Sequence, residues 1–473
     1  MGSIVRRTHK YKFKRPDLES LRKLAKMVTS PDHFRKRYGH LLSILRTDVD
    51  EGLINTLVQF YDPLYRCFTF PDYQLVPTLE EYSHWVGLPV LDKVPFHGLE
   101  PGPKIPDVAA ALHIEKADIK QYLTIKGGLQ CLPFNFLYQK ATDFAERSNA
   151  NAFETILAVL IYGMVLFPNI DNFVDMNAIQ IFLNQNPVPT LLADTYFSIH
   201  DRTNKERGVI LCCTPLLHTW ITSHLPRPKV RPERLPWSEK FMALTPADVV
   251  WYNPTFDPEV IIDHCGEFNN VPLLGTRGGI SYNPVLARRQ FGYPMRMNPL
   301  YLILDRDFFF YEKDTENKKA QFVRAWHSIV KKDKNQLGNK SSATHESYLQ
   351  WVINRATQIG MPYPLLRSLA STNPTMPSTL PPESMEEYRV RLTESERESA
   401  TWKRKYNEAM LEMETMNGQL EQKDSEILKQ RRQMIERDEL LLVKDRLLDQ
   451  YANKKKRTDF FSGTQSDSDD PSI

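Results

Sequence analysis

The chain has 473 residues, of which 41% are hydrophobic and 25% are charged, a balance typical of proteins with a buried core. The formal net charge is only +3, which excludes a uniformly basic nucleic-acid binder and leaves room only for local basic surfaces. The five cysteines are odd in number and form no CxxC pair, so a secreted disulfide framework and a zinc finger are excluded. Reduced, mostly buried thiols are expected instead.

The N-terminus is basic and has no apolar stretch, so it does not have the form of a secretory signal. The longest apolar run covers residues 153–167, contains Glu154 and is followed by Pro168, and it is too short to cross a bilayer. We therefore expect a soluble protein that makes no membrane contact. Its residues 1–15 are predicted to form a basic, flexible segment.

Helix signals begin directly after this segment. Asp17 is placed to cap a first helix. Ser30 caps a second, with Pro31 at its first position, where the missing N–H group costs nothing, and the apolar pattern continues to about residue 45. Asp50 is placed to cap a third helix.

A hairpin and a further helix are predicted next. Two aromatic and β-branched runs flank Pro71-Asp72 in YRCFTFPDYQLVP, which is typical of a β-hairpin. Thr78 and Glu81 then form a predicted capping box, in which Thr78 accepts from the helix and Glu81 reaches back to the cap N–H group. Gly87 is predicted to end this helix.

The middle of the chain has two parts that differ in composition and predicted secondary structure. Residues 105–225 are predicted to form helix after helix, whereas residues 226–312 are richer in proline, glycine and aromatics. We expect irregular structure and short strands there, such as YLILD at residues 301–305. Two more helices are predicted near residues 316–331 and 341–359.

The C-terminal part has the pattern of a linker followed by a coiled coil. Residues 361–383 hold six prolines and few charges, which indicates a linker after a helical domain of residues 16–360. Residues 384–452 lack proline, and nine of the ten first core positions of a strict heptad register are apolar. Chance would give about four at this composition. The predicted core comprises Met385, Leu392, Trp402, Tyr406, Met413, Met416, Leu420, Ile427, Met434, Leu441 and Leu448.

Flanking charges such as Glu426 and Arg431 attract each other in a parallel pair, so a parallel homodimer is predicted. A trimer, an antiparallel pair and a lone solvated helix are the alternatives. Residues 453–473 are polar and predicted to be disordered. The fold class expected is therefore mainly α: a helical domain with a small β-hairpin and an irregular Pro/Gly-rich segment, followed by a long coiled-coil helix.

The segment LINTLVQFYDPLYRCFTFPDYQLVPTLEEYSHWVGLPV resembles the plant mobile domain group, a set of transposon-associated plant proteins also called aminotransferase-like. Residues 86–89 are similar to the Leu-Gly-Leu-Pro ending of that group. LLHTW at residues 216–220 is similar to its Leu-Leu-x-x-Trp helix. The approach to the hairpin departs from the better-known members, because residues 61–65 read YDPLY where those members have Trp-Arg-Pro-x-Thr.

The segments FNNVPLLGTRGGISYNPVLARRQFGYPM and RAWHSIVKKDKNQLG resemble a legume-enriched, uncharacterised branch with a C-terminal coiled coil. The resemblance implies a helical domain of transposon ancestry with a role in nuclear silencing. The group has no established catalytic residues, so no catalytic, metal-binding or cofactor-binding residue is carried over, and no cofactor is expected.

A glycine-rich segment is the first candidate for chemistry. Residues 275–279 read GTRGG, whose backbone N–H groups could cradle an anion, although the segment matches neither standard phosphate-binding motif and a structural turn is the favoured interpretation. Four arginines nearby could form a basic surface, with ordinary solvated side chains as the favoured alternative: Arg277, Arg288, Arg289 and Arg296.

Histidine, cysteine and aspartate candidates are also weighed against structural roles. Asp263-His264-Cys265 places a thiol beside an imidazole, but sequence neighbours on a strand point in different directions. His218 and His224 lack metal-ligand spacing and nearby acids in the sequence. A transposase nuclease would need three converging carboxylates for two metal ions. Spacing selects no triad among Asp171, Asp175, Asp194, Asp263 and Asp305.

The tail offers a targeting signal. Lys454, Lys455, Lys456 and Arg457 form a compact basic tract that fits nuclear import, with a solvated run as the alternative. We expect a nuclear protein, or otherwise a cytoplasmic one. The leading hypothesis is a non-enzymatic interaction or scaffold protein that self-associates and binds unknown protein partners. The alternatives are a degenerate transposase-like nuclease and a nucleic-acid-binding protein, in which residues 6–15 would contact phosphates.

Overall fold

The computed structural model describes residues 5–226, 235–251, 256, 258–266, 268–293, 308–311, 316–340 and 346–364, together with Glu426 and Lys444. The chain divides into two units, Met1–Ser371 and Thr372–Ile473, and the fold below belongs to the first. The seam of the predicted coiled coil, residues 365–383 of the linker and the basic tract of the tail lie outside the described residues.

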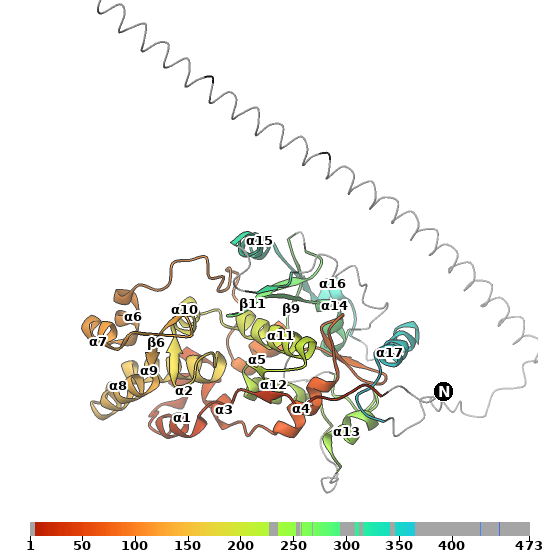
Figure 1. The fold of residues 1–473 in the computed structure, drawn as a ribbon, viewed down its shortest axis with the longest axis horizontal. Helices are drawn as coiled ribbons and strands as arrows, with labels where there is room; N and C mark the ends of the chain where they lie inside the picture. The colour runs from red at the N-terminus through yellow and green to blue at the C-terminus, as the bar shows by residue number, and fades with distance from the viewer. Residues whose placement is uncertain are drawn as a thin grey trace, which may run out of the picture. The chain divides into compact units, whose positions relative to one another are not determined.

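About half of the structure is helical, in agreement with the expected mainly α class, and small sheets lie among the helices (Figure 1). The helices are α1 (Leu18–Ala25), α2 (Pro31–Tyr38), α3 (Leu41–Arg46), α4 (Glu51–Gln59), α5 (Leu79–Val86), α6 (Ile105–Leu112), α7 (Lys116–Tyr122), α8 (Phe134–Glu146), α9 (Ala150–Ile161), α10 (Met176–Asn184), α11 (Val188–Lys205), α12 (Thr214–Ser223), α13 (Trp237–Ala243), α14 (Pro284–Ala287), α15 (Glu316–Trp326), α16 (Lys334–Leu337) and α17 (Glu346–Ile359). A π-helical turn, η1 (Tyr162–Leu166), extends α9, and a 3₁₀ turn, η2 (Arg288–Phe291), extends α14.

The strands are short and form small, separate sheets. They are β1 (Lys12–Phe13), β2 (Tyr61–Asp62), β3 (Cys67–Thr69), β4 (Gln74–Leu75), β5 (Thr124–Lys126), β6 (Leu129–Pro133), β7 (Phe173–Asp175), β8 (Val209–Ile210), β9 (Val260–Cys265), β10 (Val271–Leu274), β11 (Gly278–Tyr282), β12 (Phe310–Tyr311) and β13 (Ile329–Asp333). In the described part of the chain, the sheet orders are β1-β8, β2-β3-β4, β5-β6-β7, β9-β13 and β10-β11-β12.

The helix caps predicted at Asp17 and Asp50 are confirmed. The Asp17 side chain accepts a hydrogen bond from Glu19 N (3.1 Å), and the Asp50 side chain accepts one from Leu53 N (3.0 Å). The helix expected from residue 30 to about 45 is interrupted, because Gly39 adopts a φ of +67° and separates α2 from α3. A Cβ atom at Gly39 would lie 2.3 Å from a carbonyl oxygen of α5, so only glycine permits this close approach of the two backbones.

The predicted hairpin is confirmed as β3 and β4, with β2 as a third strand. The predicted capping box is confirmed for only one of its two hydrogen bonds. Thr78 Oγ1 accepts from Glu81 N (3.1 Å), but the Glu81 carboxylate turns into the core instead of reaching back to the cap N–H group. Gly87 ends α5 in the left-handed region, as predicted.

The N-terminal segment was predicted to be flexible, and this prediction is wrong for residues 5–15. The strand β1 pairs in parallel with β8, and Val5 forms a bridge with Met361, whose carbonyl oxygen accepts from Arg6 N (3.0 Å). Apolar and basic residues alternate in KYKFK, so an extended chain buries Tyr11 to 7% exposure and leaves Lys10 and Lys12 in solvent. The segment therefore joins the core through its tyrosine and phenylalanine.

Other differences come from strands with distant partners. Strands β5, β6 and β7 interrupt the region expected to be helical throughout. The helix expected at residues 316–331 ends at Trp326, because Ile329–Asp333 pairs with Val260–Cys265 as β13. The expected strand at residues 301–305 lies outside the described residues.

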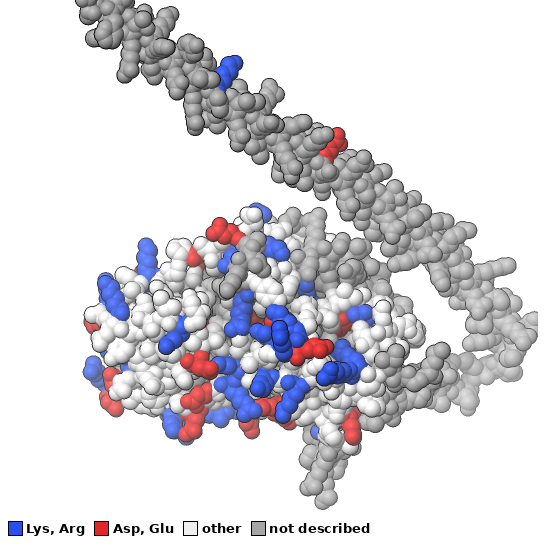
Figure 2. Space-filling view, viewed as in Figure 1, with Lys and Arg blue, Asp and Glu red and all other residues white. Residues whose placement is uncertain are grey.

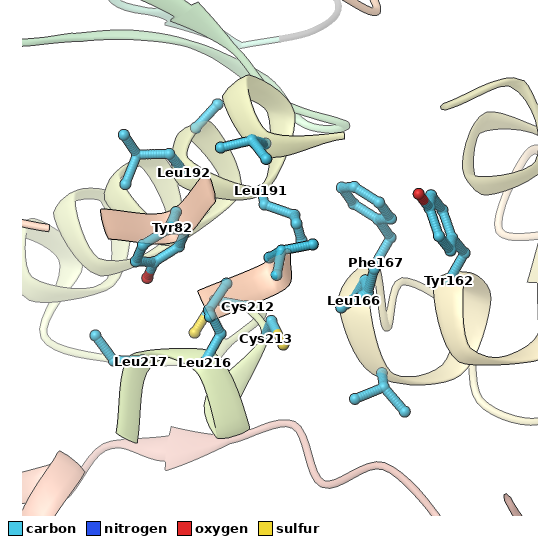
Figure 3. Packing of buried hydrophobic residues seen from close by; sticks show 14 of the residues in the cluster. Tyr82, Tyr162, Leu166, Phe167, Leu191, Leu192, Cys212, Cys213, Leu216 and Leu217 are labelled. Atoms are coloured by element: carbon cyan, nitrogen blue, oxygen red, sulfur yellow. The ribbon is translucent and has the colours of Figure 1, made fainter. Parts of the chain in front are cut away.

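The core is built where α5, α11 and α12 meet, and Figure 3 shows Tyr82 of α5 among leucines of the other two helices. Cys212 and Cys213 lie in the same apolar layer, and burial raises the pKa of Cys213 to about 12. All five cysteines are buried and unpaired, as the sequence predicted. Among the described residues, no helix combines the length and the apolar character needed to cross a bilayer.

A buried ion pair holds the last helix of the unit against the hairpin sheet. Asp62 of β2 is fully buried, and its two carboxylate oxygens accept from Arg355 Nε and Nη2 of α17, each at 2.8 Å. The Arg355 guanidinium also lies over the Tyr65 ring, 5.2 Å from its centre. This two-point contact fixes α17 relative to β2.

Replacement of Arg355 with methionine should lower the free energy of unfolding by about 3–5 kcal/mol, because it leaves the Asp62 carboxylate buried without its cation. Urea unfolding followed by tryptophan fluorescence measures the change. Gln350→Ala, at an exposed position of the same helix, is the control and should change stability by less than about 0.5 kcal/mol. A loss of similar size in both variants would contradict the role of the ion pair.

Candidate functional site

A buried polar cluster centres on the carboxylate of Glu81, which α5 directs into the core. Glu81 Oε2 accepts hydrogen bonds from Thr78 Oγ1 (2.9 Å), Trp220 Nε1 (3.0 Å) and Gln290 Nε2 (3.1 Å). Glu81 Oε1 lies 2.9 Å from His224 Nε2. These contacts join α5, α12 and η2, whose residues are far apart in the sequence.

The cluster is arranged for structure and not for proton transfer. His224 Nδ1 lies 2.9 Å from the carbonyl oxygen of Val250, and Nε2 faces Glu81, so both ring nitrogens are engaged within the protein. No ring nitrogen is left to exchange a proton with a substrate. The hollow beside the cluster measures about 20 Å³, which is room for about one water molecule.

Glu80, the neighbouring residue, has a different environment. Its Oε1 accepts from Ile262 N (2.8 Å), and burial raises the pKa of Glu80 to about 7, with the Glu81 charge raising it further. The two adjacent carboxyl groups thus have different surroundings, because several side chains donate to Glu81 whereas a backbone N–H group donates to Glu80.

A larger groove lies on the other side of Trp85, which lines both the small hollow and the groove. We call it the Trp85 groove. Its volume of about 460 Å³ is in the range of ligand-binding sites. It is lined by Pro31, Asp32, Phe34, Arg35, Gly39, His40, Leu42, Ser43, Ile44, Arg46, Thr47, Trp85, Leu216 and Thr219.

The groove is apolar at its base and basic at its rim. Phe34, Ile44 and Leu216 are buried, whereas Arg35 and Arg46 are exposed and form no ion pair within the described part of the chain. The Arg22 guanidinium, which could have joined them, instead donates to the carbonyl oxygens of Leu45 in α3 and of Thr47, which follows it. The rim is therefore positively charged, and Asp32 is the acidic residue among those that line it.

The glycine-rich segment of residues 275–279 forms a turn, as expected. It connects β10 and β11, and its Thr276 N–H group is occupied by Asp194 Oδ1 at 2.8 Å, so the chain's own carboxylate fills the place of a bound anion. A Cβ at Gly275 would lie 2.2 Å from the same oxygen. Thr276 Oγ1 contacts both Asp194 Oδ2 (3.0 Å) and Asn169 Oδ1 (3.1 Å).

Of the aspartates considered for a nuclease, Asp175 and Asp194 come near each other through Asn169 and Thr276, and among the described residues no third carboxylate joins them. Asp171 is exposed and pairs with Lys14, Asp175 caps α10, Asp194 holds the β10–β11 turn, and Asp263 lies in β9. Asp305 lies outside the described residues. Within the residues that the structure describes, no three His, Cys, Asp or Glu side chains are grouped to hold a metal ion.

The Asp263-His264-Cys265 segment is also structural. Although burial acts in the opposite direction, hydrogen bonds from Lys332, His264 and Arg288 hold the pKa of Asp263 below its ordinary value. His264 Nδ1 lies 3.0 Å from Asp263, and burial raises the pKa of the Cys265 thiol to about 12. The thiol is therefore protonated and is not activated by its neighbour.

The two histidines were expected to have no acidic neighbours, and this is wrong for both. Glu81 is the partner of His224 across 143 positions of sequence, and the charges of Asp50 and Asp48 act on His218. Burial lowers the pKa of the half-buried His218, while Asp50 opposes the shift. Of the arginines expected to form a basic surface, Arg288 pairs with Asp263, and Arg289 is buried with its guanidinium 3.8 Å from the centre of the Trp251 ring.

The last of those arginines, Arg296, lies outside the described residues, and so does the basic tract Lys454–Arg457. Sequence reasoning missed the Glu81 cluster and the groove. The available signals were the two segments that carried the resemblance, TLEEY and LLHTW, because Glu81 and Trp220 come from them and meet in the core.

A family model described as a domain of unknown function (DUF7745) matches residues 21–357. This range contains every residue that lines the Trp85 groove and every residue of the Glu81 cluster. No curated protein and no solved structure matches the chain.

The Asp194 carboxyl group should make stability depend on pH. Burial raises its pKa to about 7, above the value of about 4 expected in the unfolded chain, so the folded protein holds the proton more tightly. The stability that this proton contributes is complete below about pH 4 and is lost as pH rises through about 7. Asp194→Asn, which imitates the protonated form, should remove this dependence.

Urea unfolding at several pH values from 5 to 8 tests the expectation. Between pH 5 and 7 the free energy of unfolding of the unmodified protein should fall, relative to the variant, by up to about 1.4 kcal/mol per pH unit. Asp171→Asn, at an exposed carboxylate, is the control. Parallel curves for the unmodified protein and Asp194→Asn would show that Asp194 does not titrate in this range.

Proposed function

The chain belongs to the DUF7745 family of domains of unknown function, and from its own residues we propose that it is a self-associating interaction protein. Its helical domain binds an acidic segment of a partner protein in the Trp85 groove, and its C-terminal coiled coil brings two such domains together. The observation that carries the proposal is the basic rim of the groove beside an accessible tryptophan.

The groove has the composition of a protein-binding site. Tryptophan and arginine are the residues that most often dominate the energy of protein interfaces, and here Trp85 lines the same groove as Arg35 and Arg46. Because neither arginine has an ion-pair partner among the described residues, both can pair with incoming carboxylates. An apolar side chain of the partner would contact Leu42 and Trp85, which are only partly buried.

The rigid setting of the groove supports this role. Helices α2 and α3 are tied to the end of α5 by the hydrogen bond from His40 N to Val86 O (2.6 Å) and by the close approach at Gly39. A preformed groove loses little freedom when a partner binds, which favours affinity. We infer a partner segment with two or more acidic residues and one large apolar anchor.

Self-association rests on the heptad pattern of the sequence. Apolar residues at nine of ten first core positions and attractive flanking charges support a parallel homodimer. Two linked groove-bearing domains would bind a partner with repeated acidic segments more tightly than one domain, because the second contact is intramolecular.

A nuclear role is the setting that the sequence supports best. The tract Lys454–Arg457 fits an import signal, and the resemblance to the plant mobile domain group suggests transposon ancestry and silencing.

Selection from a library of random 12-residue peptides against the full chain tests the groove. The enriched peptides should be rich in Asp and Glu and contain a Phe, Trp or Leu. Trp85→Ala and the double variant Arg35→Glu/Arg46→Glu should each weaken binding of these peptides by about tenfold or more, as expected for interface anchors.

The control for that experiment is Lys116→Glu/Lys120→Glu on α7, which makes the same change in net charge at exposed positions outside the groove. It should leave binding unchanged. Selected peptides that are not acidic, or that bind the groove variants as well as the unmodified chain, would refute the proposed site.

The coiled coil is tested by solution mass from light scattering. Leu420→Asp/Ile427→Asp places charges at two first core positions and should convert the dimer to a monomer, because unpaired charges in the seam are strongly unfavourable. Leu411→Asp/Leu428→Asp makes the same charge change at outer positions of the register and should leave the dimer intact. A monomeric unmodified chain would overturn the self-association proposal.

A further inference from the structure

Charge is distributed unevenly along the chain. Residues 5–46 hold 13 Lys and Arg against three Asp and Glu, a net charge of +10. The whole chain carries +3, so the remaining residues carry a net −7. The near-neutral total therefore hides a strongly basic N-terminal region.

Part of this region is an extended segment that carries exposed cations. The apolar side chains of Tyr11 and Phe13 face the core, which directs Lys10 and Lys12 to solvent. Lys12 of β1 pairs in parallel with Val209 of β8. Arg207 is exposed and lies two residues before Val209, on the segment next to Lys12. Arg7 is exposed as well, because its neighbour Arg6 turns inward to backbone carbonyl oxygens.

We call Arg7, Lys10, Lys12 and Arg207 the basic strand face. In Figure 2, Lys and Arg gather in the middle and lower part of the face shown, over the region where Figure 1 draws the N-terminal segment. Acidic side chains lie among them there.

Two of the acids near this face are paired with other cations: Asp171 contacts Lys14, and Glu51 contacts Arg15. A third, Glu206, lies 3.3 Å from His9 Nε2. In the described part of the chain, the four residues of the basic strand face form no ion pair, so their charges face solvent.

We infer that the basic strand face binds the phosphodiester backbone of a nucleic acid. Lys10 and Lys12 stand at alternate positions of an extended segment, about 7 Å apart, and Arg7 and Arg207 add exposed cations on the same and the adjoining segment, so several charges are available to neighbouring phosphates. The face contains no aromatic anchor, so it lacks the feature that a protein segment would need for tight binding. Contacts of this kind recognise the backbone and are insensitive to base sequence.

This surface is distinct from the Trp85 groove and does not depend on the proposed protein partner. Arg7, Lys10, Lys12 and Arg207 are not among the residues that line the groove. Variants of each site should therefore affect one kind of binding and leave the other intact.

The test is fluorescence anisotropy of the full chain with labelled 20-base-pair duplex DNA and with single-stranded RNA of equal length. Binding should be in the micromolar range and should weaken steeply with salt, as backbone contacts require. Lys10→Gln/Lys12→Gln should raise Kd for the preferred nucleic acid about tenfold at low salt. It should also reduce the slope of log K against log salt by about 2, since two phosphate contacts are lost.

The controls separate charge from folding. Lys116→Gln/Lys120→Gln on α7 makes the same charge change at exposed positions outside the basic strand face and should keep full affinity. Arg207→Gln changes no residue of β1 and should raise Kd about threefold to fivefold by itself, as expected for one lost phosphate contact.

The outcomes decide the inference. Stronger binding to DNA or to RNA identifies the nucleic acid and supports the assignment. Equal losses in the α7 control and the strand variant, or polyglutamate competing as well as DNA, would overturn it, since binding would then reflect net charge alone. Absence of nucleic-acid binding would also overturn it and would leave the groove and the coiled coil untouched.

Discussion

The structure depends on one buried carboxylate that is surrounded by donors. Glu81 cannot be buried unless the Thr78 hydroxyl, the Trp220 indole, the Gln290 amide and the His224 ring all reach it, because a buried charge without partners costs several kcal/mol. Those partners come from segments as far as 209 residues away. Many compact arrangements could bury the apolar residues of this chain, but few could also bring these four donors together, so the cluster selects the native packing of α5 against α12 and η2.

The same helix connects this constraint to the surface. Trp85 follows Glu81 by four residues, about one helical turn, and yet it lines the groove as well as the small hollow beside the cluster. The position of Trp85 is therefore set by the core and not by the solvent-exposed rim. Gly39 completes the arrangement by allowing α2 and α3 to approach the end of α5. A binding surface built in this way is held in place before any partner arrives.

Structural features that depend on neighbouring residues could be predicted from the sequence, whereas features that depend on contacts with distant residues could not. The caps at Asp17 and Asp50, the hairpin and the end of α5 at Gly87 follow from local backbone chemistry, and each was located correctly. The inward turn of Glu81 was not predictable, because a glutamate at that helix position usually serves the cap. The strand β13 was missed for the same reason, since its partner lies more than 60 residues earlier. The alternation in KYKFK was a readable strand signal that the density of positive charge obscured.

The bridge between Val5 and Met361 brings the two ends of the helical domain together. A domain whose first and last described segments meet can be circularly permuted: a short peptide could join these segments while new termini open in an exposed loop, such as Gly127-Gly128 between β5 and β6. Because the two ends are hydrogen-bonded to each other, detachment of one end would also destabilise the other. Insertion of this domain within a larger polypeptide would therefore need no change to its fold.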